Sequence, residues 1–369
     1  MAAMHVIVVG AGISGLGTAW ALAKRGHRVS LIERDVIPNP LGASGDHHRI
    51  IRRAYSADLQ GYTDRMTEAF AAWDELWADL GAEHIVRAGF MGIVRAPGDN
   101  ADQYRDGLAR GGYPFETLAK DAALARFPYL DPQGFTDIFL SPEGGVLLCL
   151  RIAADMVAWL RARGVTIREQ AVVTGIDAAA PSVTLAGGER LSADAVVVTA
   201  GAWVTGLLPD LADRLASRRT YVVYLDPPAE FRAAWAGTPA IPGIGGDIGG
   251  YILPPVAGTD LKFGAGATRT EWIADTPFEL PPDAGVQLRD MFGPLFRRLA
   301  DYQVKRVRKC VYTFTHDDRF FSTRRGAAWV VSACSGHGYK FGAAIGRRVA
   351  DAVESGDDKA LAAWLEARD

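Results

Sequence analysis

The sequence has few of the features that mark disulfide-built, metal-dependent or membrane proteins. It has three cysteines, at positions 149, 310 and 334, without Cys-x-x-Cys spacing, so neither a disulfide framework nor a structural zinc site is expected. None of its histidines stands in a His-Glu-x-x-His motif, and we expect no metal. No apolar run approaches the roughly 18 residues of a membrane span. The start of the chain lacks the pattern of a signal peptide. We therefore expect a reduced, soluble, cytoplasmic protein with no membrane partner.

The sequence also lacks an excess of one charge. Lys and Arg total 40 and Asp and Glu total 43, which gives a formal net charge of −3. Without a positive excess, no nucleic-acid partner is expected. The 369 residues are 49% hydrophobic and 22% charged, which supplies a sizeable core and excludes disorder over most of the length. Such a chain is long enough for an enzyme of two lobes.

The first 33 residues have the pattern of a nucleotide-binding β-α-β unit. A β-rich run at His5–Val9 leads into a Gly-x-Gly-x-x-Gly turn, a helical run over 16–25 and a second β-rich run over 29–32. Gly10 allows the tight turn, Gly12 lets the backbone approach a pyrophosphate, and Gly15 lets the helix pack on the strand. The helix N-terminus offers free N–H groups to the phosphates. Glu33 follows the second strand, where a carboxylate binds ribose hydroxyls. An acid at this position argues against a 2′-phosphate on the ribose, and therefore against NADP.

Further strands of this Rossmann-type lobe occur late in the chain. Apolar runs over 195–199 and 328–333 are typical of buried parallel strands, and each ends in a turn of small residues where ligands bind. Because long segments of other sequence separate the strands of this lobe, we expect an α/β fold in which two domains interleave. The nucleotide-binding domain is expected over 1–82, 146–213 and 306–369. A mostly antiparallel substrate domain, with strands at Gly250–Leu253 and 261–264, is expected over 83–145 and 214–305.

Four ordered segments resemble the monomeric sarcosine oxidase family of D-amino-acid-oxidase-like, FAD-dependent enzymes. The first is an arginine-bearing loop at residues 44–55, and the second is the pair of Tyr251 and Lys262 on neighbouring strands. The third is a Lys-Cys segment at 309–315, and the fourth is a glycine-rich segment at 335–341. The resemblance extends from residue 4 to about residue 355. It implies FAD as the cofactor, a small-molecule amine and O₂ as substrates, and a monomer.

The resemblance implies cofactor-binding residues along most of the chain. Besides the three glycines, Glu33 and Cys310, they are Ile13, Ser14, Arg34, Ser44, Arg49, Val173, Ala200, Gly201, Trp203, Gly336, His337, Gly338 and Lys340. Arg49 corresponds to an arginine that lies over the flavin ring, where a guanidinium can stack. His337 is expected to order its turn, while the glycines beside it offer backbone N–H groups to the flavin.

Cys310 is implied as the point where FAD is covalently attached, through an 8α-S-cysteinyl bond. Arg306, Arg308 and Lys309 are expected to favour the thiolate that attachment needs. The alternative is that Cys310 is a small buried hydrophobic residue, which is the interpretation given to the other two cysteines.

Lys262, Arg49, Tyr251 and His48 are the candidate catalytic residues. A fixed cation such as Lys262 beside the flavin stabilises the negative charge that O₂ acquires on reduction. The alternative for Lys262 is a lysine at a strand edge. Tyr251 is also a candidate for contact with the substrate.

The chain departs from the family at two places near this site. The family has a histidine before a Gly-Asp pair, whereas His47 and His48 follow that pair here. Gly266 stands where the family carries an active-site histidine, four residues beyond the lysine. The pocket is therefore expected to be larger, or adapted to another amine.

Arg52 and Lys340 are the candidate anchors for a substrate carboxylate. Arginine can hold a carboxylate with two parallel hydrogen bonds, and lysine adds a point charge. The alternative is that they form surface salt bridges, and Arg53 is the arginine of this loop first expected to face solvent.

These residues predict oxidation of the C–N bond of an N-methyl or cyclic amino acid to an imine, with O₂ reduced to H₂O₂. Three alternatives stay open. The first is a dehydrogenase that passes electrons to a quinone or carrier protein. The second is a flavin hydroxylase that uses NAD(P)H, although the sequence shows no second nucleotide fingerprint. The third is a flavin-binding protein without enzymatic activity.

Overall fold

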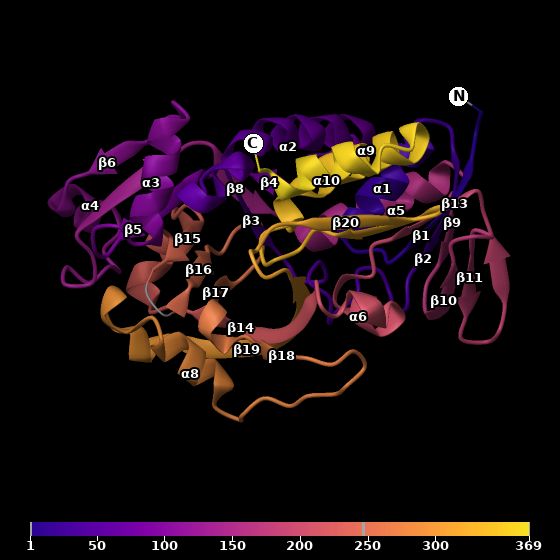
Figure 1. The fold of residues 1–369 in the computed structure, drawn as a ribbon. Coiled ribbons are helices and arrows are strands. Elements are labelled where there is room, and N and C mark those ends of the chain that lie inside the picture. The colour runs from indigo at the N-terminus through magenta and orange to yellow at the C-terminus, as the bar shows by residue number, and fades with distance from the viewer. Residues whose placement is uncertain (1, 246–247, 369) are drawn as a thin grey trace.

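The computed structural model describes residues 2–245 and 248–368 and has a six-stranded, mostly parallel sheet in its first lobe (Figure 1). The strand order is β20-β21-β13-β1-β2-β9. The strands are β1 His5–Val9, β2 Arg28–Ile32, β9 Thr166–Arg168, β13 Ala195–Val198, β20 Phe321–Arg325 and β21 Ala328–Ser332. Only the β20–β21 pair is antiparallel. β1 forms the centre because its residues Val6–Val9 are apolar and buried on both faces.

The two ends of the chain meet on one face of this sheet. Helix α1, Ile13–Lys24, packs against α9, Gly342–Ser355, and Figure 1 shows the yellow C-terminal helices beside the indigo N-terminal ones. Glycines allow this approach: a Cβ on Gly17 would lie 2.4 Å from the carbonyl oxygen of Gly342. The remaining helices around this core are α2 Gln60–Leu80, α5 Cys149–Ala162 and α10 Asp358–Glu366.

The second lobe is built on an antiparallel sheet. Its strands are β14 Ala216–Asp226, β15 Ile241–Ile244, β16 Gly250–Leu253, β17 Leu261–Ala265, β18 Thr270–Glu271 and β19 Gln303–Phe314. The order is β15-β16-β17-β14-β18, and β19 also pairs along β14. A stacked pair, Tyr129 and Trp235 with ring centroids 3.9 Å apart, lies in its core.

Three small sheets and several short helices complete the fold. The sheets are β3 Arg49–Arg52, β8 Gly144–Leu147 and β4 Ile85–Val86; β5 Phe90–Val94, β7 Asp137–Ser141 and β6 Glu116–Leu118; and β10 Val173–Asp177, β11 Ser182–Leu185 and β12 Arg190–Ser192. The helices are α3 Asn100–Arg110, α4 Lys120–Arg126, α6 Val204–Leu207, α7 Arg232–Ala236 and α8 Ala284–Asp290. No helix in the described part of the chain has the length and apolarity needed to cross a bilayer.

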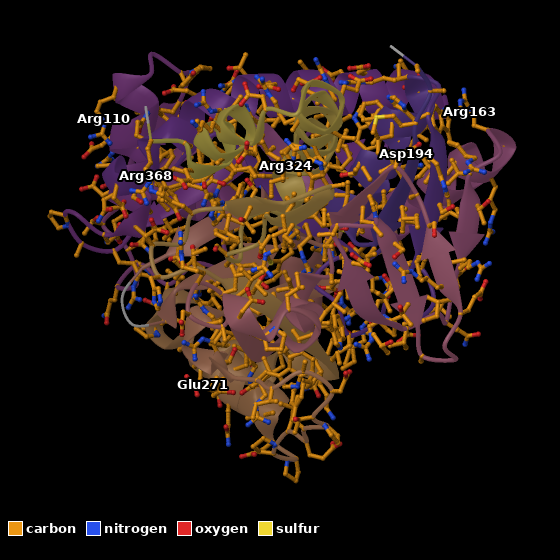
Figure 2. The ribbon with its side chains drawn as sticks, turned by 45° about the vertical axis from the view of Figure 1, so that its right-hand side comes forward. Arg110, Arg163, Asp194, Glu271, Arg324 and Arg368 are labelled. Atoms are coloured by element: carbon orange, nitrogen blue, oxygen red, sulfur yellow. The ribbon has the colours of Figure 1, made fainter. Side chains whose placement is uncertain are left out.

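The α/β fold with a parallel and an antiparallel sheet confirms the predicted fold class, and strands of the parallel sheet come from the beginning, middle and end of the chain. The expected domain boundary at residue 306 falls inside β19, a strand that pairs with β14 almost throughout. Long charged side chains such as Arg110, Arg163 and Glu271 lie on the outer surface (Figure 2).

Candidate active site

A cavity of about 840 Å³ opens at the carboxyl ends of the parallel strands. Gly10 after β1, Glu33 after β2, Ala200 after β13 and Ala333 after β21 all line it. The antiparallel sheet contributes Tyr251 and other residues to the opposite side. In open α/β sheets this edge is where ligands bind. Among the described residues, no group of three or more metal-ligating side chains is present.

The glycine turn forms a tight cradle on this wall. Gly10 has a φ of +97°, and a Cβ on it would lie 2.5 Å from the carbonyl oxygen of Thr199. A Cβ on Gly15 would lie 1.8 Å from the carbonyl oxygen of Gly10, so this glycine serves helix–strand packing as expected. The backbone N–H of Ile13 donates to Ser44 Oγ at 2.9 Å. The backbone therefore has room to approach a pyrophosphate.

Glu33 is buried at the end of β2. Its carboxylate accepts hydrogen bonds from the backbone N–H groups of Ala11 at 2.7 Å and Asp35 at 3.2 Å. Burial raises the pKa of this carboxyl group. The cradle and the acid together fit the pyrophosphate and ribose of a dinucleotide such as FAD.

The cavity gathers nearly the whole set of predicted cofactor residues. Every one of them lines it except Gly15, which packs behind the turn. Arg34 lies over the ring of Trp203 at 4.9 Å and pairs with Asp275 at 2.5 Å. These residues come from seven separate stretches of sequence, and only the fold brings them together.

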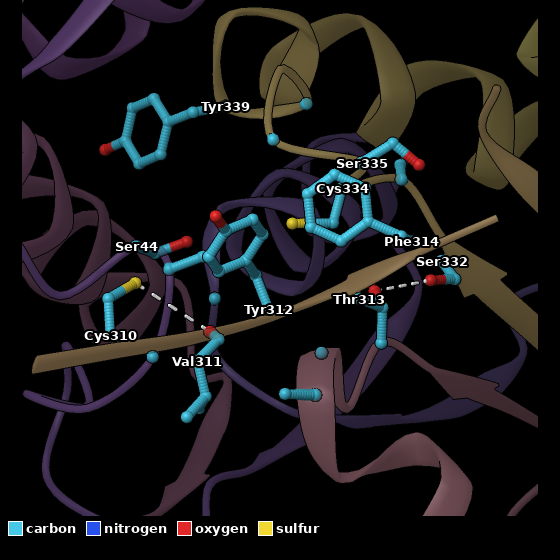
Figure 3. Close-up of a pocket in the computed structure, with 18 of the residues that line it drawn as sticks. Ser44, Cys310, Val311, Tyr312, Thr313, Phe314, Ser332, Cys334, Ser335 and Tyr339 are labelled. Carbon is cyan, nitrogen blue, oxygen red and sulfur yellow. Dashed lines mark hydrogen bonds between the residues drawn. The ribbon is translucent and has the colours of Figure 1, made fainter. Parts of the chain in front are cut away.

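Cys310 faces the cavity from β19. Figure 3 shows it with Tyr312 and Phe314, which share its face of the strand because side chains alternate. Burial raises the pKa of the Cys310 thiol to about 11, although the charge of Arg49 opposes this. Burial therefore favours the thiol over the thiolate at this position, and Arg49 is the main nearby charge that works in the other direction.

Of the three basic residues expected to favour the Cys310 thiolate, Arg308 is the one whose charge opposes the rise in the pKa of that thiol, while Lys309 and Arg306 have other partners. Lys309 points to the other face of β19 and pairs with Glu279 at 3.0 Å. Arg306 lies over the ring of Tyr224 at 4.0 Å. Arg308 reaches Asp46 at 3.5 Å. Alternation along β19 explains the position of Lys309, whereas Arg306 and Arg308 lie on the same face as Cys310 but have Tyr224 and Asp46 as their partners.

Arg52 is held rigidly between two aromatic rings. Its guanidinium carbon lies 4.6 Å from the ring centre of Tyr55 and 4.2 Å from that of Tyr104. Nη2 donates to the Tyr104 hydroxyl at 3.1 Å. Nη1 is buried without a hydrogen-bond partner, although the residue lines the cavity. An unpaired buried donor of this kind is uncommon and points to a ligand.

Lys340 lines the cavity near Arg52 and is 4% exposed. Its ammonium donates to the Tyr55 hydroxyl and to the His337 carbonyl, each at 2.8 Å. The His337 ring contacts that same hydroxyl through Nδ1 at 3.0 Å and the Asp318 carbonyl through Nε2 at 2.8 Å. His337 therefore orders the turn, as expected. Burial, first, and the nearby Arg52 charge lower the pKa of Lys340 well below its usual range.

Asp46 is the centre of a buried charge cluster. Its carboxylate pairs with Arg49 at 2.5 Å and with Lys262 at 3.0 Å, and it accepts a hydrogen bond from the Tyr224 hydroxyl. Arg308 adds a weaker contact. Although burial opposes it, the charge of Lys262, followed by those of Arg49 and Arg308, holds the pKa of Asp46 well below its usual range.

Lys262 and His48 do not line the cavity. The Lys262 side chain is 0% exposed and donates to Asp46 and to the His48 carbonyl at 2.6 Å. Burial lowers the pKa of Lys262 to about 8. The His48 ring is buried with both nitrogens unpartnered, and burial lowers its pKa well below its usual range. The structure thus places His48 out of reach of a ligand in the cavity, against the expectation of a catalytic role.

Tyr251 does reach the cavity wall. It lies opposite Gly264 in the β16–β17 pair. A Cβ on that glycine would be 2.3 Å from the tyrosine ring, so the absence of a side chain at Gly264 makes room for the ring. Burial raises the pKa of Tyr251 to about 12, so its hydroxyl stays protonated and available as a donor.

Sequence reasoning missed four residues of this site: Tyr55, Tyr104, Asp46 and Arg269. Tyr55 and Asp46 lie in the arginine-bearing loop, where their spacing from Arg52 and Arg49 was a usable signal. Tyr104 comes from α3 and Arg269 from the turn after β17. Nothing in the sequence connects either of them to the loop.

The comparisons with known proteins agree with this geometry. A family model described as FAD dependent oxidoreductase matches residues 5–352. Peroxisomal sarcosine oxidase from Homo sapiens is 26% identical over 358 residues, which cover 92% of this chain and 90% of that protein. Monomeric sarcosine oxidase from Bacillus sp. (strain B-0618) is 26% identical over 362 residues, with the same 92% and 90% coverage. The solved structure of L-proline dehydrogenase from P. horikoshii has a TM-score of 0.81 at 18% identity, covering 99% of this chain and 97% of that one, and shows the same fold.

Proposed function

The chain belongs to the family of FAD-dependent oxidoreductases, and from that premise we propose that it oxidises the C–N bond of a secondary amino acid, N-methyl or cyclic. The products are an imine and H₂O₂: the amine loses two electrons and two protons, and O₂ takes up both. When bound, FAD supplies the two-electron acceptor, and the protein supplies binding, orientation and charge.

The observation that carries this proposal is the pair of buried basic side chains, Arg52 and Lys340, on the cavity wall. Among the described residues, no carboxylate lies within ion-pair distance of Arg52 or Lys340, although both are at least nine-tenths buried. An unpaired buried charge is costly, and an anionic ligand removes that cost. A substrate carboxylate held by Arg52 Nη1 and Lys340 Nζ satisfies both groups.

The surrounding residues fix how such a substrate lies. Tyr55 and Tyr104 clamp the Arg52 guanidinium, so little rotamer freedom is lost when a carboxylate binds. A carboxylate beside Lys340 favours the charged form of that lysine and draws a proton to Nζ. Tyr251 offers a protonated hydroxyl to the polar atoms of the substrate.

The reaction is tested by mixing the purified flavoprotein under nitrogen with N-methyl amino acids and proline. We expect one of these amines to bleach the flavin, and admitted air to restore the colour with one H₂O₂ formed for each amine oxidised. Bleaching by NADPH would support the hydroxylase instead. If none of the amines tested bleaches the flavin, the proposed activity is overturned.

A dehydrogenase is the second candidate, because Lys262 is neutralised by Asp46 and does not line the cavity. A cation placed in this way gives O₂ less stabilisation than one that faces it. Fast reduction of a dye or quinone together with slow recovery of colour in air would select this candidate.

We propose further that FAD is attached covalently to Cys310, whose side chain faces the cavity. Acid precipitation should then leave a yellow pellet, and the tryptic peptide 310–319 should carry the mass of one FAD. Cys310→Ser should release all of the flavin to the supernatant. Cys334→Ser is the matched control, because Cys334 lines the same cavity and should leave the pellet yellow. An unmodified peptide from the yellow wild-type protein would exclude attachment at Cys310.

A further inference from the structure

Another guanidinium, that of Arg269, lines the same cavity from a different wall than Arg52. Arg269 follows the turn at the end of β17, whereas Arg52 lies on β3. Its Nε donates to the Gly266 carbonyl at 3.1 Å, and the guanidinium carbon lies 5.0 Å from the ring centre of Phe314. Within residues 2–245 and 248–368, no carboxylate forms an ion pair with it. Asp318, which lines the same cavity, feels the charge of Arg269 but lies beyond ion-pair distance, so neither terminal nitrogen of Arg269 is held by that carboxylate.

Arg269 directs its charge into the cavity. It is among the groups that lower the pKa of Tyr251 and Tyr312 against the effect of burial, and both tyrosines line the cavity. Tyr312 and Phe314 are packed together, with ring centroids 4.8 Å apart, and form an apolar wall on β19 beside this charge.

Gly266 explains why the guanidinium can lie there. A Cβ on Gly266 would stand 2.3 Å from Arg269 Nη2, so a larger residue at this position would displace the arginine. The sequence suggested that Gly266 leaves the pocket larger or adapted to another amine. In the structure the space beside Gly266 holds the positive charge of Arg269, so the difference from the family bears on the chemistry of the pocket as well as on its size.

We propose that Arg269 selects substrates with a second anionic group, that is, dicarboxylic secondary amino acids of the N-methylglutamate type. The inference rests on the proposed function, because the α-carboxylate is taken to bind Arg52 and Lys340. The distal carboxylate then pairs with Arg269, and the methylenes between them pack on Tyr312 and Phe314. A cationic side chain is rejected by the same charge.

The test compares ligands of equal shape and different charge. 2-(Methylthio)pentanedioate and its 5-monoamide carry sulfur in place of the amine nitrogen and cannot form an imine, so binding is measured by calorimetry without turnover. We expect the wild-type holoenzyme to bind the dianion about tenfold more tightly than the amide, since one charge-assisted contact at an exposed arginine is worth about that factor. Because Arg269 is exposed, high salt should reduce the ratio.

The variants separate this site from the α-carboxylate anchor. Arg269→Gln should bring the ratio near one, whereas Arg52→Lys should weaken both ligands and keep the ratio. Arg219→Gln is the control, because Arg219 is bonded to Thr270 outside the cavity lining and should keep the tenfold ratio. Equal wild-type affinities, or an unchanged ratio in Arg269→Gln, would overturn the proposal.

Turnover gives the second readout, with N-methylglutamate and N-methylglutamine as the matched pair. A kcat/KM about tenfold higher for N-methylglutamate than for N-methylglutamine, with the difference lost in Arg269→Gln, supports the proposal. Oxidation of both amines without dependence on Arg269 overturns this inference and leaves the proposed function standing. Arg269-dependent binding of the dianion without oxidation of any amine overturns the proposed function and leaves a dianion site.

Discussion

Lys262→Met should lower the rate at which O₂ restores the colour of the amine-bleached protein by about 100-fold, the usual cost of removing one electrostatic contact to a developing negative charge. The rate of bleaching under nitrogen should change little, because the amine binds in the cavity and Lys262 does not line it. Asp46 keeps Arg49, Arg308 and Tyr224 as partners, so we expect the variant to fold. Stopped-flow absorbance separates the two rates.

The same prediction has a pH signature. The pKa of Lys262 is lowered to about 8, so the ammonium is charged below that pH and loses its proton above it. The wild-type O₂ rate should therefore fall as the pH rises through about 8, and the variant should lack this step. Lys305→Met is the control, because Lys305 is an exposed lysine paired with Asp260 and should keep the step. An O₂ rate that Lys262→Met leaves unchanged would assign oxygen activation to the cavity-lining Arg49 or favour the dehydrogenase.

Arg52→Ala should raise KM for carboxylated amines by about 100-fold to 1000-fold, the range expected when one partner of a buried charge pair is removed. The effect should appear in KM more than in kcat if the guanidinium holds the carboxylate equally before and during the reaction. An amine without a carboxylate should be oxidised with unchanged KM. Steady-state kinetics on a matched pair of amines measures both.

Arg53→Ala provides the neighbouring control. Arg53 does not face solvent as the sequence suggested: it is buried, because Glu143 pairs with it, Thr67 accepts its hydrogen bond at 2.8 Å and the ring centre of Tyr113 lies 4.1 Å away. It does not line the cavity. Its loss should cost stability and leave KM unchanged. If Arg52→Ala also leaves KM unchanged, the carboxylate anchor has been assigned to the wrong residue.

The sequence predicted the local units of the fold well. The β-α-β unit and Glu33 could be located because the turn needs glycine for steric reasons and the order of strand, turn, helix and strand is itself informative. Buried strands such as β13 and β21 were visible as continuous apolar runs. The long β14 was not, since its alternation of exposed and buried residues is interrupted by two consecutive arginines, Arg218 and Arg219.

The direction of individual side chains was harder to predict. Lys262 and His48 were assigned to the cavity, but the buried carboxylate of Asp46 draws Lys262 away from it. Arg308 likewise turns to Asp46 and not to Cys310. A carboxylate that pairs with cations from two distant strands, β17 and β19, can be found only when those strands are placed beside its loop. The role of Gly266 is similar, because its consequence depends on where Arg269 lies.

The order of the parallel sheet has a consequence for synthesis of the protein. β1 and β2 leave the ribosome close together, but the other neighbour of β1 in the sheet, β13, emerges much later, and β21 later still. The wall that carries Lys340 follows β21. A nascent chain therefore contains the glycine turn long before it contains Thr199, against which Gly10 packs, and one edge of β1 stays unpaired until β13 is made. Capture of FAD belongs to the finished chain, so a shortage of FAD in the cell would reduce the yield of active protein after translation and not the rate of translation itself.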